Sequence, residues 1–184
     1  NYAIISHANM PDKVNYLYGF LLNGVIKALE KIGAKAYIEN INDIVISSRK
    51  VSGTAAAIKE DTMLLHGALL VSTDLEKLYK VLKVSKKKLE DKGVSSVKYR
   101  VGLLEELLSR KINLFELVNS FANAFSELFN TRYYFDLPSK LELAVADTLY
   151  EEKYLKDEWN LYKTSPVTFK KTYDYLEELI LNSQ

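Results

Sequence analysis

Apolar residues recur at three- and four-residue steps in the segment that follows Pro11. This stripe predicts an amphipathic helix, and its members are Val14, Leu17, Leu21, Val25, Ala28, Leu29 and Ile32. Proline suits the first turn of a helix. Gly33 suits the end, because glycine adopts the left-handed cap conformation without strain. We therefore expect a helix between Pro11 and Gly33.

The pattern then changes to short β-branched runs. We expect strands at 36–39, 43–48, 51–58 and 63–72, separated by polar positions that include the Arg49-Lys50 pair and residues 59–61. Strands at this spacing predict a meander rather than alternating strand–helix–strand units.

Helical patterns dominate from Thr73 onward. We expect helices at 74–82 and 169–181, and two more that begin at the capping-box pairs Asn113 with Glu116 and Ser139 with Glu142. No internal repeat, low-complexity tract or linker separates these segments. The sequence therefore predicts one α+β domain over residues 1–184, with a mixed or antiparallel sheet packed against helices.

Composition narrows the classes of function. Hydrophobic residues make up 48% and charged residues 27%, which is typical of a folded globular protein. The net charge of +1 gives no global field for nucleic acid or membrane, so an anionic ligand must be held locally. The chain begins without a signal-peptide pattern and has no apolar run near the ~20 residues of a membrane span. We expect a cytoplasmic protein that binds neither nucleic acid nor membranes.

Lys50 is the first candidate for chemistry. It lies where one expected strand passes to the next, and the small residues at 53–57 follow it. Gly53 and the alanines leave room for a ligand against the backbone, and a lysine there could hold phosphate or carboxylate oxygens. The same residues also fit a hairpin with a solvated Arg-Lys turn, which the pattern alone favours.

Two further segments stay ambiguous. His66 lies in the apolar run 64–70 and fits either a hydrogen-bonded core position or a pocket, while no carboxylate or cysteine stands at metal-ligand spacing from it or from His7. The lysines at 86, 87, 88 and 92 precede Gly93 and fit either a solvated face or a loop that closes over an anionic ligand. Sequence alone does not choose between these interpretations.

Taken in order, several of these segments resemble motifs of the lipoate–protein ligase A family, in the biotin/lipoate ligase superfamily. Residues 42–44 resemble its Asn-Asp element and residues 49–55 its Arg-Lys-x-Ser-Gly-x-Ala motif. Residues 66–70 resemble its His-Gly-Thr-Leu-Leu strand, with Ala68 in place of threonine. Residues 88–94 and 96–101 resemble its adenylate-binding loop and the following segment, with Tyr99 where serine is common. Asn1-Tyr2 resembles the end of a Gly-Asn-x-Asn-Tyr strand, and the resemblance extends to about Pro166.

The resemblance implies an ATP-dependent ligase with a biotin/lipoate ligase-like catalytic domain. Such an enzyme activates lipoate as lipoyl-AMP and transfers it to a lysine of an acceptor lipoyl domain, in a 2-oxoacid dehydrogenase E2 or the glycine cleavage H protein. By resemblance Lys50 is the catalytic cation and Asp43 holds magnesium or the nucleotide. The other implied substrate- and nucleotide-binding residues are Asn42, Arg49, Ser52, Gly53, Thr54, Ala55, His66, Gly67, Lys92 and Gly93.

Two parts of the family's pattern have no counterpart in this sequence: the Arg-Arg-x-x-Gly-Gly-Gly loop and the C-terminal accessory domain. We therefore expect an upstream segment or a separate accessory subunit. The alternatives are a non-catalytic lipoyl-domain-binding subunit or paralogue and, more distantly, a biotin–protein ligase. Transferases that form a thioester need a cysteine nucleophile, and this sequence has no cysteine.

Overall fold

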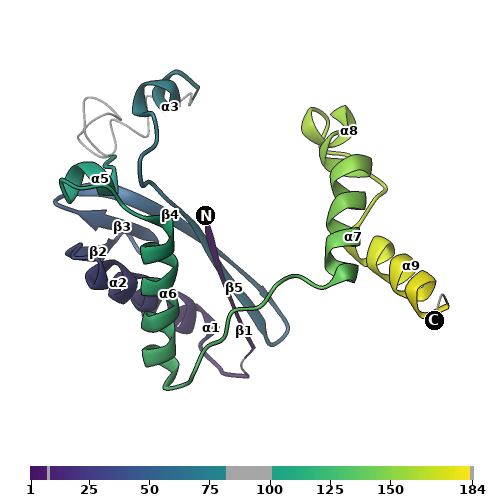
Figure 1. Cartoon of the computed structure of the whole chain (residues 1–184), viewed down its shortest axis with the longest axis horizontal. Helices are drawn as coiled ribbons and strands as arrows, with labels where there is room; N and C mark the ends of the chain where they lie inside the picture. Colours follow the sequence, from purple (N-terminus) through teal and green to yellow (C-terminus); the bar gives the residue numbers. More distant parts are fainter. Residues whose placement is uncertain (8, 82–100, 183–184) are drawn as a thin grey trace. The chain divides into compact units, whose positions relative to one another are not determined.

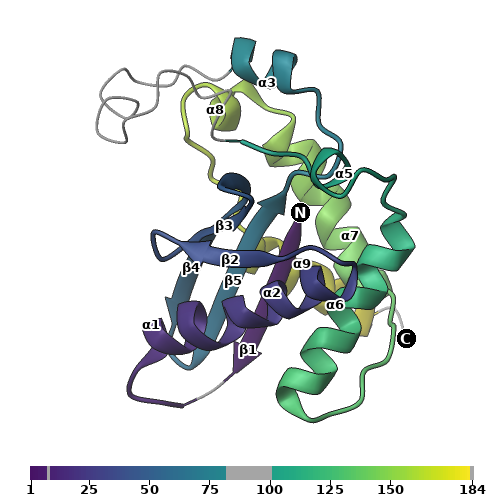
Figure 2. The same cartoon turned by 90° about the vertical axis from the view of Figure 1, so that its left-hand side faces the viewer.

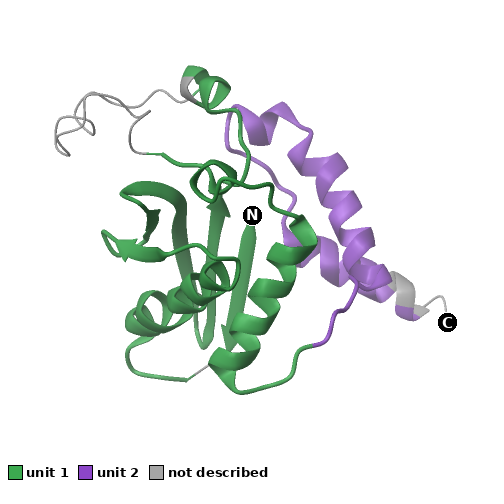
Figure 3. Ribbon diagram, turned by 60° about the vertical axis from the view of Figure 1, so that its left-hand side comes forward, with its two compact units in different colours: residues 1–133 green, residues 134–184 purple. Residues whose placement is uncertain are grey.

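The computed structural model describes residues 1–7, 9–81 and 101–182. The chain divides into two compact units, Asn1–Tyr133 and Tyr134–Gln184 (Figure 3). The sequence predicted one catalytic domain over the whole length. That both units function together as this domain stays a prediction. The loop expected to close over a ligand, with Lys92 and Gly93, lies outside the described residues.

Unit 1 is built on one five-stranded sheet in the order β1-β5-β4-β3-β2 (Figure 1). Its strands are β1 (Tyr2–His7), β2 (Ala36–Glu39), β3 (Asp43–Ile46), β4 (Arg49–Lys59) and β5 (Thr62–Leu69). All strand pairs are antiparallel. The predicted α+β class and the meander from β2 to β5 are confirmed, whereas the hydrophobic pattern did not predict β1.

The turn between β3 and β4 lies earlier than the sequence predicted. Ser47 and Ser48 have φ values of 49° and 62°, and positive φ at both central residues is typical of a two-residue hairpin turn of type I′. Arg49 and Lys50 therefore begin β4 instead of forming the turn. The last predicted strand is also shorter than expected, because β5 ends at Leu69.

The helix predicted after Pro11 is present as three consecutive segments: α1 (Lys13–Asn15), the π-helical η1 (Tyr16–Leu21) and α2 (Leu22–Lys31). Gly33 has φ +88°, which confirms the left-handed end. The predicted apolar stripe is buried from Leu17 onward, but Val14 is 59% exposed. A π-helical turn contains more residues than an α-helical one, so the spacing read as one stripe does not keep Val14 on the buried face.

The core of unit 1 lies between the sheet and two helices, α2 and α6 (Leu114–Phe129), which cover one face (Figure 2). The two helices pack closely at Gly24, where a Cβ atom would lie 2.7 Å from the Phe125 ring. On the opposite face of the sheet, Ala3, Ala55, His66 and Ala68 are exposed. We call this side the open face.

Two short helices complete unit 1, α3 (Leu75–Val81) and α5 (Leu104–Leu107). The segment before α5 is fixed to the ends of β4 and β5. The Gly102 amide donates to the Lys50 carbonyl at 2.9 Å, and the Leu104 amide donates to the Leu70 carbonyl at 2.9 Å. Asn113 is the N-cap of α6, as predicted, but its side chain accepts from the Phe115 amide and not from that of Glu116, whose carboxylate pairs with Arg110.

Unit 2 is helical in its described part. It contains α7 (Lys140–Leu149), the π-helical η3 (Tyr150–Tyr154), α8 (Asp157–Asn160) and α9 (Phe169–Asn182). The predicted capping box is confirmed: the Ser139 hydroxyl accepts from the Glu142 amide, and the Glu142 carboxylate accepts from the Ser139 amide. The helix predicted at 169–181 corresponds to α9.

One row of the sheet explains why β5 has a glycine at position 67. Thr54 on β4, Gly67 on β5 and Tyr2 on β1 are register partners. The Tyr2 ring crosses Gly67, so a Cβ atom there would lie 2.5 Å from the tyrosine oxygen and 3.0 Å from the Gly53 carbonyl oxygen. The absence of a side chain at Gly67 therefore lets β1 and β4 interact across β5.

We expect Gly67→Ala to destabilise unit 1 by about 1–3 kcal/mol, because overpacking a close contact forces side chains or backbone to shift. Equilibrium unfolding in urea, followed by far-ultraviolet circular dichroism, measures the loss of unfolding free energy. Adding Tyr2→Ala should cancel part of it, since that change removes the ring that the new methyl group meets. Strictly additive effects of the two substitutions would contradict this explanation.

We expect Ser139→Ala to weaken the start of α7 by about 1 kcal/mol, the usual cost of losing a helix N-cap. Amides of the first turn should then exchange with deuterium about fivefold faster, since they exchange through local opening. Exchange unchanged in α7 would contradict the role of the cap.

The stability that this capping box gives to the start of α7 should depend on pH. Hydrogen bonds with the backbone amide and the side chain of Ser139 lower the pKa of the Glu142 carboxyl group. A lowered folded-state pKa stabilises the fold above the unfolded value, and this stabilisation is lost as pH falls through the folded value. Glu142→Gln keeps the hydrogen-bonding pattern without the titration, so it should remove the acid sensitivity of α7 exchange.

Candidate active site

A β-bulge near the start of β4 decides which side chains share the open face. Ile44 pairs with Ser52 and Val45 pairs with Lys50, so Val51 is an extra residue on β4. An extra residue interrupts the alternation of side chains along a strand. Lys50 and Gly53 consequently lie on the same face although they are three positions apart, and Asp43 lies opposite Gly53.

These three residues form the centre of the candidate site. The Lys50 Nζ atom lies 2.5 Å from Asp43 Oδ1, with the lysine side chain 36% exposed and the aspartate side chain 8% exposed. A Cβ atom on Gly53 would lie 2.9 Å from Lys50 Nζ and 3.0 Å from its Cε atom. Lys50 therefore extends across Gly53 to a nearly buried carboxylate, which excludes the alternative of a solvated Arg-Lys turn.

Asn42 and Thr54 hold the backbone beside Asp43. The Asn42 side-chain amide donates to the Thr54 carbonyl at 2.8 Å, and the Thr54 hydroxyl donates to the Asn42 carbonyl at 2.9 Å. The preceding turn is strained: Ile41 has φ +75°, and the Asn42 amide donates to the Asn40 carbonyl at 2.9 Å. Positive φ at a β-branched residue persists only where the surrounding structure imposes it.

Two other predicted ligand-binding side chains point elsewhere. The Arg49 guanidinium lies 3.7 Å from the Glu106 carboxylate of α5. The Ser52 side chain is on the core face, where its Oγ atom lies 3.1 Å from the Tyr2 hydroxyl. Their contacts with substrate or nucleotide stay predictions, and for Ser52 the contact would have to come from the backbone.

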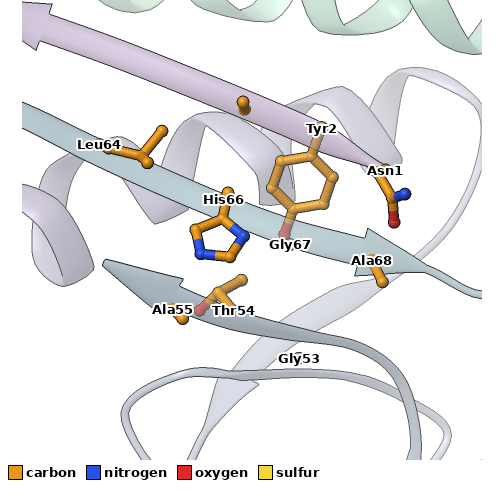
Figure 4. A pocket seen from close by; sticks show the side chains of 10 residues that line it. Asn1, Tyr2, Gly53, Thr54, Ala55, Leu64, His66, Gly67 and Ala68 are labelled. Carbon is orange, nitrogen blue, oxygen red and sulfur yellow. The ribbon is translucent and has the colours of Figure 1, made fainter. Parts of the chain in front are cut away.

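The open face contains a shallow hollow of about 680 Å³ next to Gly53. Ala55, His66, Gly67 and Ala68, all named in the sequence motifs, are among its lining residues, and Figure 4 shows the His66 ring beside Gly67. The volume is in the range of small-molecule sites. His66 is exposed on this face, so the interpretation of His66 as a core residue is wrong.

The site also contains features that the motifs did not predict. Tyr2, whose motif did not indicate a role in the site, is among the residues that line the hollow. The Gly102 amide donates to the Lys50 carbonyl, and Glu106 pairs with Arg49. Burial raises the pKa of Tyr2, an effect that the hydrogen bond with Ser52 partly offsets. The bulge at Val51 leaves no signal in the hydrophobic pattern, because one extra residue in a strand of small side chains does not change the composition of the run.

The Lys50 ammonium gives the site a positive charge that can hold an anion. Among the described residues, no cluster of three or more histidine, cysteine, aspartate or glutamate side chains could bind a metal. The helices in the described ranges are also too short or too polar to span a membrane. The Lys50 ammonium, which lies over Gly53 and pairs with Asp43, is a charged group available to a ligand on the open face.

Several known proteins are similar to this chain in sequence. The chain is 28% identical over 171 residues to lipoate-protein ligase A subunit 1 from Thermoplasma acidophilum, and 32% identical over 146 residues to lipoate-protein ligase LplJ from Bacillus subtilis. These matches cover 88% and 77% of this chain, but only 64% and 43% of the relatives. It is also 25% identical to octanoyltransferase LipM from Brevibacillus brevis, over 87% of this chain and 67% of the relative.

Solved structures show the same fold. A bi-partite lipoate protein ligase from Thermoplasma acidophilum, studied with its E2 lipoyl domain, superposes with a TM-score of 0.73 and 26% identity, covering 90% of this chain and 65% of that one. A lipoate-protein ligase A bound with ATP has the same fold, with a TM-score of 0.70 at 24% identity over 86% of this chain and 63% of that one. The family model described as the lipoyl protein ligase A/B catalytic domain matches residues 1–126. The chain therefore belongs to the lipoyl protein ligase A/B catalytic domain family.

Proposed function

We propose that this chain activates lipoate with ATP to form lipoyl-AMP and transfers the lipoyl group to a lysine of an acceptor lipoyl domain. The observation that carries this proposal is the Lys50 ammonium, which lies over Gly53 beside the open hollow and is held by the nearly buried Asp43. Membership of the family supports lipoyl chemistry in general. The use of ATP is supported by the similar fold of a ligase that binds it.

The first step joins two anions. A carboxylate oxygen of lipoate attacks the α-phosphorus of ATP, and pyrophosphate leaves with the electron pair of the broken P–O bond. Negative charge therefore gathers on the carboxylate and phosphate oxygens. A cation fixed in place before the reaction lowers this barrier without reorganisation, and Lys50 is in the position to supply it.

The second step moves the acyl group. The acceptor amine attacks the acyl carbon of lipoyl-AMP, an oxyanion develops on the acyl oxygen, and AMP leaves as the amine loses a proton. The same Lys50 ammonium would stabilise the oxyanion and the departing phosphate. The hollow, with its alanines and His66, would hold the acyl chain next to Gly53.

Asp43 serves the site in two ways in this proposal. It keeps Lys50 extended across Gly53, and it is the carboxylate that would hold Mg²⁺. Magnesium usually keeps several waters and takes one or two protein carboxylates together with substrate phosphates, so a single carboxylate fits the ion. When bound, the ion would neutralise phosphate charge.

The proposal extends to partners. The acceptor would be a lipoyl domain of an E2 protein or the H protein, and an upstream segment or separate accessory subunit would complete the site. The similarity to a ligase described as bi-partite and studied with its E2 lipoyl domain supports both points. We further propose that this chemistry takes place in the cytoplasm.

The octanoyltransferase relatives favour one alternative, acyl transfer without ATP. A thioester mechanism would need a cysteine, and none of the 184 residues is one. A non-catalytic lipoyl-domain-binding role and biotin ligation are the remaining alternatives. A binding subunit has no need of a lysine that is paired with a nearly buried aspartate beside an open hollow, which argues for catalysis.

We expect Lys50→Ala to lower the rate of lipoyl-AMP formation about 10²- to 10³-fold, the usual cost of removing one preorganised charge contact. Mass spectrometry of the adenylate and of a purified acceptor lipoyl domain measures both steps. Lys59→Ala is the matched control, because Lys59 ends the same strand in an exposed position. Labelling of the acceptor without ATP would contradict the ligase proposal. Transfer of octanoate or biotin in preference to lipoate would instead support the corresponding alternative.

We expect Gly53→Ala to reduce lipoyl-AMP formation about 10-fold or more while changing stability little. The new methyl group would meet the flexible end of Lys50, and a shift of about 1 Å in a catalytic group can cost up to ~100-fold. Ala57→Val, on an exposed position of the same strand face, is the control for added bulk. Full activity in Gly53→Ala would show that the position of the Lys50 amine over Gly53 is irrelevant to the reaction.

A further inference from the structure

Two pairs of hydroxyl groups connect β1 with the rest of unit 1. The Tyr2 hydroxyl lies 3.1 Å from Ser52 Oγ on β4, and Ser6 Oγ lies 2.9 Å from the Tyr16 hydroxyl on η1. Both pairs join a tyrosine to a serine, and both are partly buried. Only the pair of Tyr2 and Ser52 reaches the strand that bears Lys50.

The Tyr2 side chain is held firmly over β5. Figure 4 shows its ring reaching from β1 to Gly67, where the missing Cβ leaves room for it. The Phe121 ring of α6 packs against it with the ring centroids 5.3 Å apart. The hydroxyl therefore has a fixed position on the core face of the sheet.

Ser52 is the residue that follows the bulge. It is 1% exposed, pairs with Ile44 on β3 and with Leu69 on β5, and precedes Gly53. Because Val51 is the extra residue, Lys50 reaches the open face only while the bulge stays between Lys50 and Ser52. A shift of register by one residue would move side chains to the other face, and Lys50 would lose both Asp43 and the space over Gly53.

We propose that Tyr2 is a positioning residue for Lys50: its hydroxyl anchors Ser52 from the core face, fixes the bulge, and so keeps the Lys50 amine on Asp43 across Gly53. The effect on catalysis rests on the proposed function, whereas the effect on the Lys50 amine does not. Without the tyrosine hydroxyl, the buried Ser52 hydroxyl loses its partner, and a buried polar group without a partner favours rearrangement of its surroundings.

The test compares Tyr2→Phe with Tyr16→Phe. Each variant keeps the aromatic ring and removes one hydroxyl from one Tyr–Ser pair, so the loss of a partly buried hydrogen bond is matched. Melting temperature reports the structural cost of each change. Two readouts report on Lys50: steady-state kinetics of lipoyl-AMP formation, and competitive acetylation of lysine amines followed by mass spectrometry.

We expect Tyr2→Phe to lower kcat about tenfold, since small displacements of a catalytic group have effects of this order, and to leave KM for ATP and lipoate within about twofold. The Lys50 amine should acetylate several-fold faster than in the unaltered protein, because an ammonium held by a carboxylate reacts slowly. Tyr16→Phe should lower the melting temperature similarly and leave kcat and Lys50 acetylation unchanged.

A double-mutant cycle tests the route through Ser52. Ser52→Ala should reproduce the effect of Tyr2→Phe, and the double variant should be no worse than either single one, because residues that share one interaction are not additive. Equal effects of Tyr2→Phe and Tyr16→Phe on kcat and on Lys50 acetylation would overturn the proposal. If the unaltered protein forms no lipoyl-AMP even when the proposed upstream segment or accessory subunit is supplied, the proposed function fails, and the acetylation rates alone decide the positioning role.

Discussion

The pairing of Asp43 with Lys50 is the constraint on which the rest of the site depends. A carboxylate that is only 8% exposed must be paired, because a buried charge without a partner costs several kcal/mol. The partner can reach it only across a residue without a side chain, and Gly53 supplies that space. The bulge at Val51 then brings lysine and glycine to the same face. Removing any one of these features would leave the aspartate unpaired or the lysine displaced.

The same constraint separates the roles of the two faces of the sheet, since one face contributes stability and the other contains the candidate site. Helices α2 and α6 cover one face with a continuous apolar core, so that side supplies the stability. The other face keeps alanine, glycine and His66 exposed, so that side can receive a ligand. Tyr2 crosses beneath the hollow on the core face and meets Ser52 there. The core face thus supports the backbone from which the open face presents Lys50.

Much of this could be predicted from the sequence, and the remainder has physical reasons. The helix that ends at Gly33, the meander and the Ser139 capping box follow from local patterns, and the structure contains them. Three outcomes depend on geometry that the pattern does not encode. The π-helical η1 removes Val14 from the predicted stripe, positive φ at two serines moves the β3–β4 turn before Arg49, and the bulge decides the face of Lys50. The face of the sheet on which His66 lies could not be predicted either, since residues 64–70 are too uniformly apolar to show alternation.

A lysine that is already paired is suited to the proposed chemistry. A free ammonium would be fully hydrated, and substrate binding would have to remove that water. The carboxylate of Asp43 replaces part of the hydration and fixes the direction of the amine before any ligand arrives, which is the condition for electrostatic preorganisation. The lysine side chain is 36% exposed, so incoming ligand oxygens can approach it. In the proposed reaction, substrate anions would share Lys50 with the Asp43 carboxylate. Asp43 would therefore moderate the binding of the substrate carboxylate and phosphate, while Lys50 would still stabilise the charge that develops in the transition state.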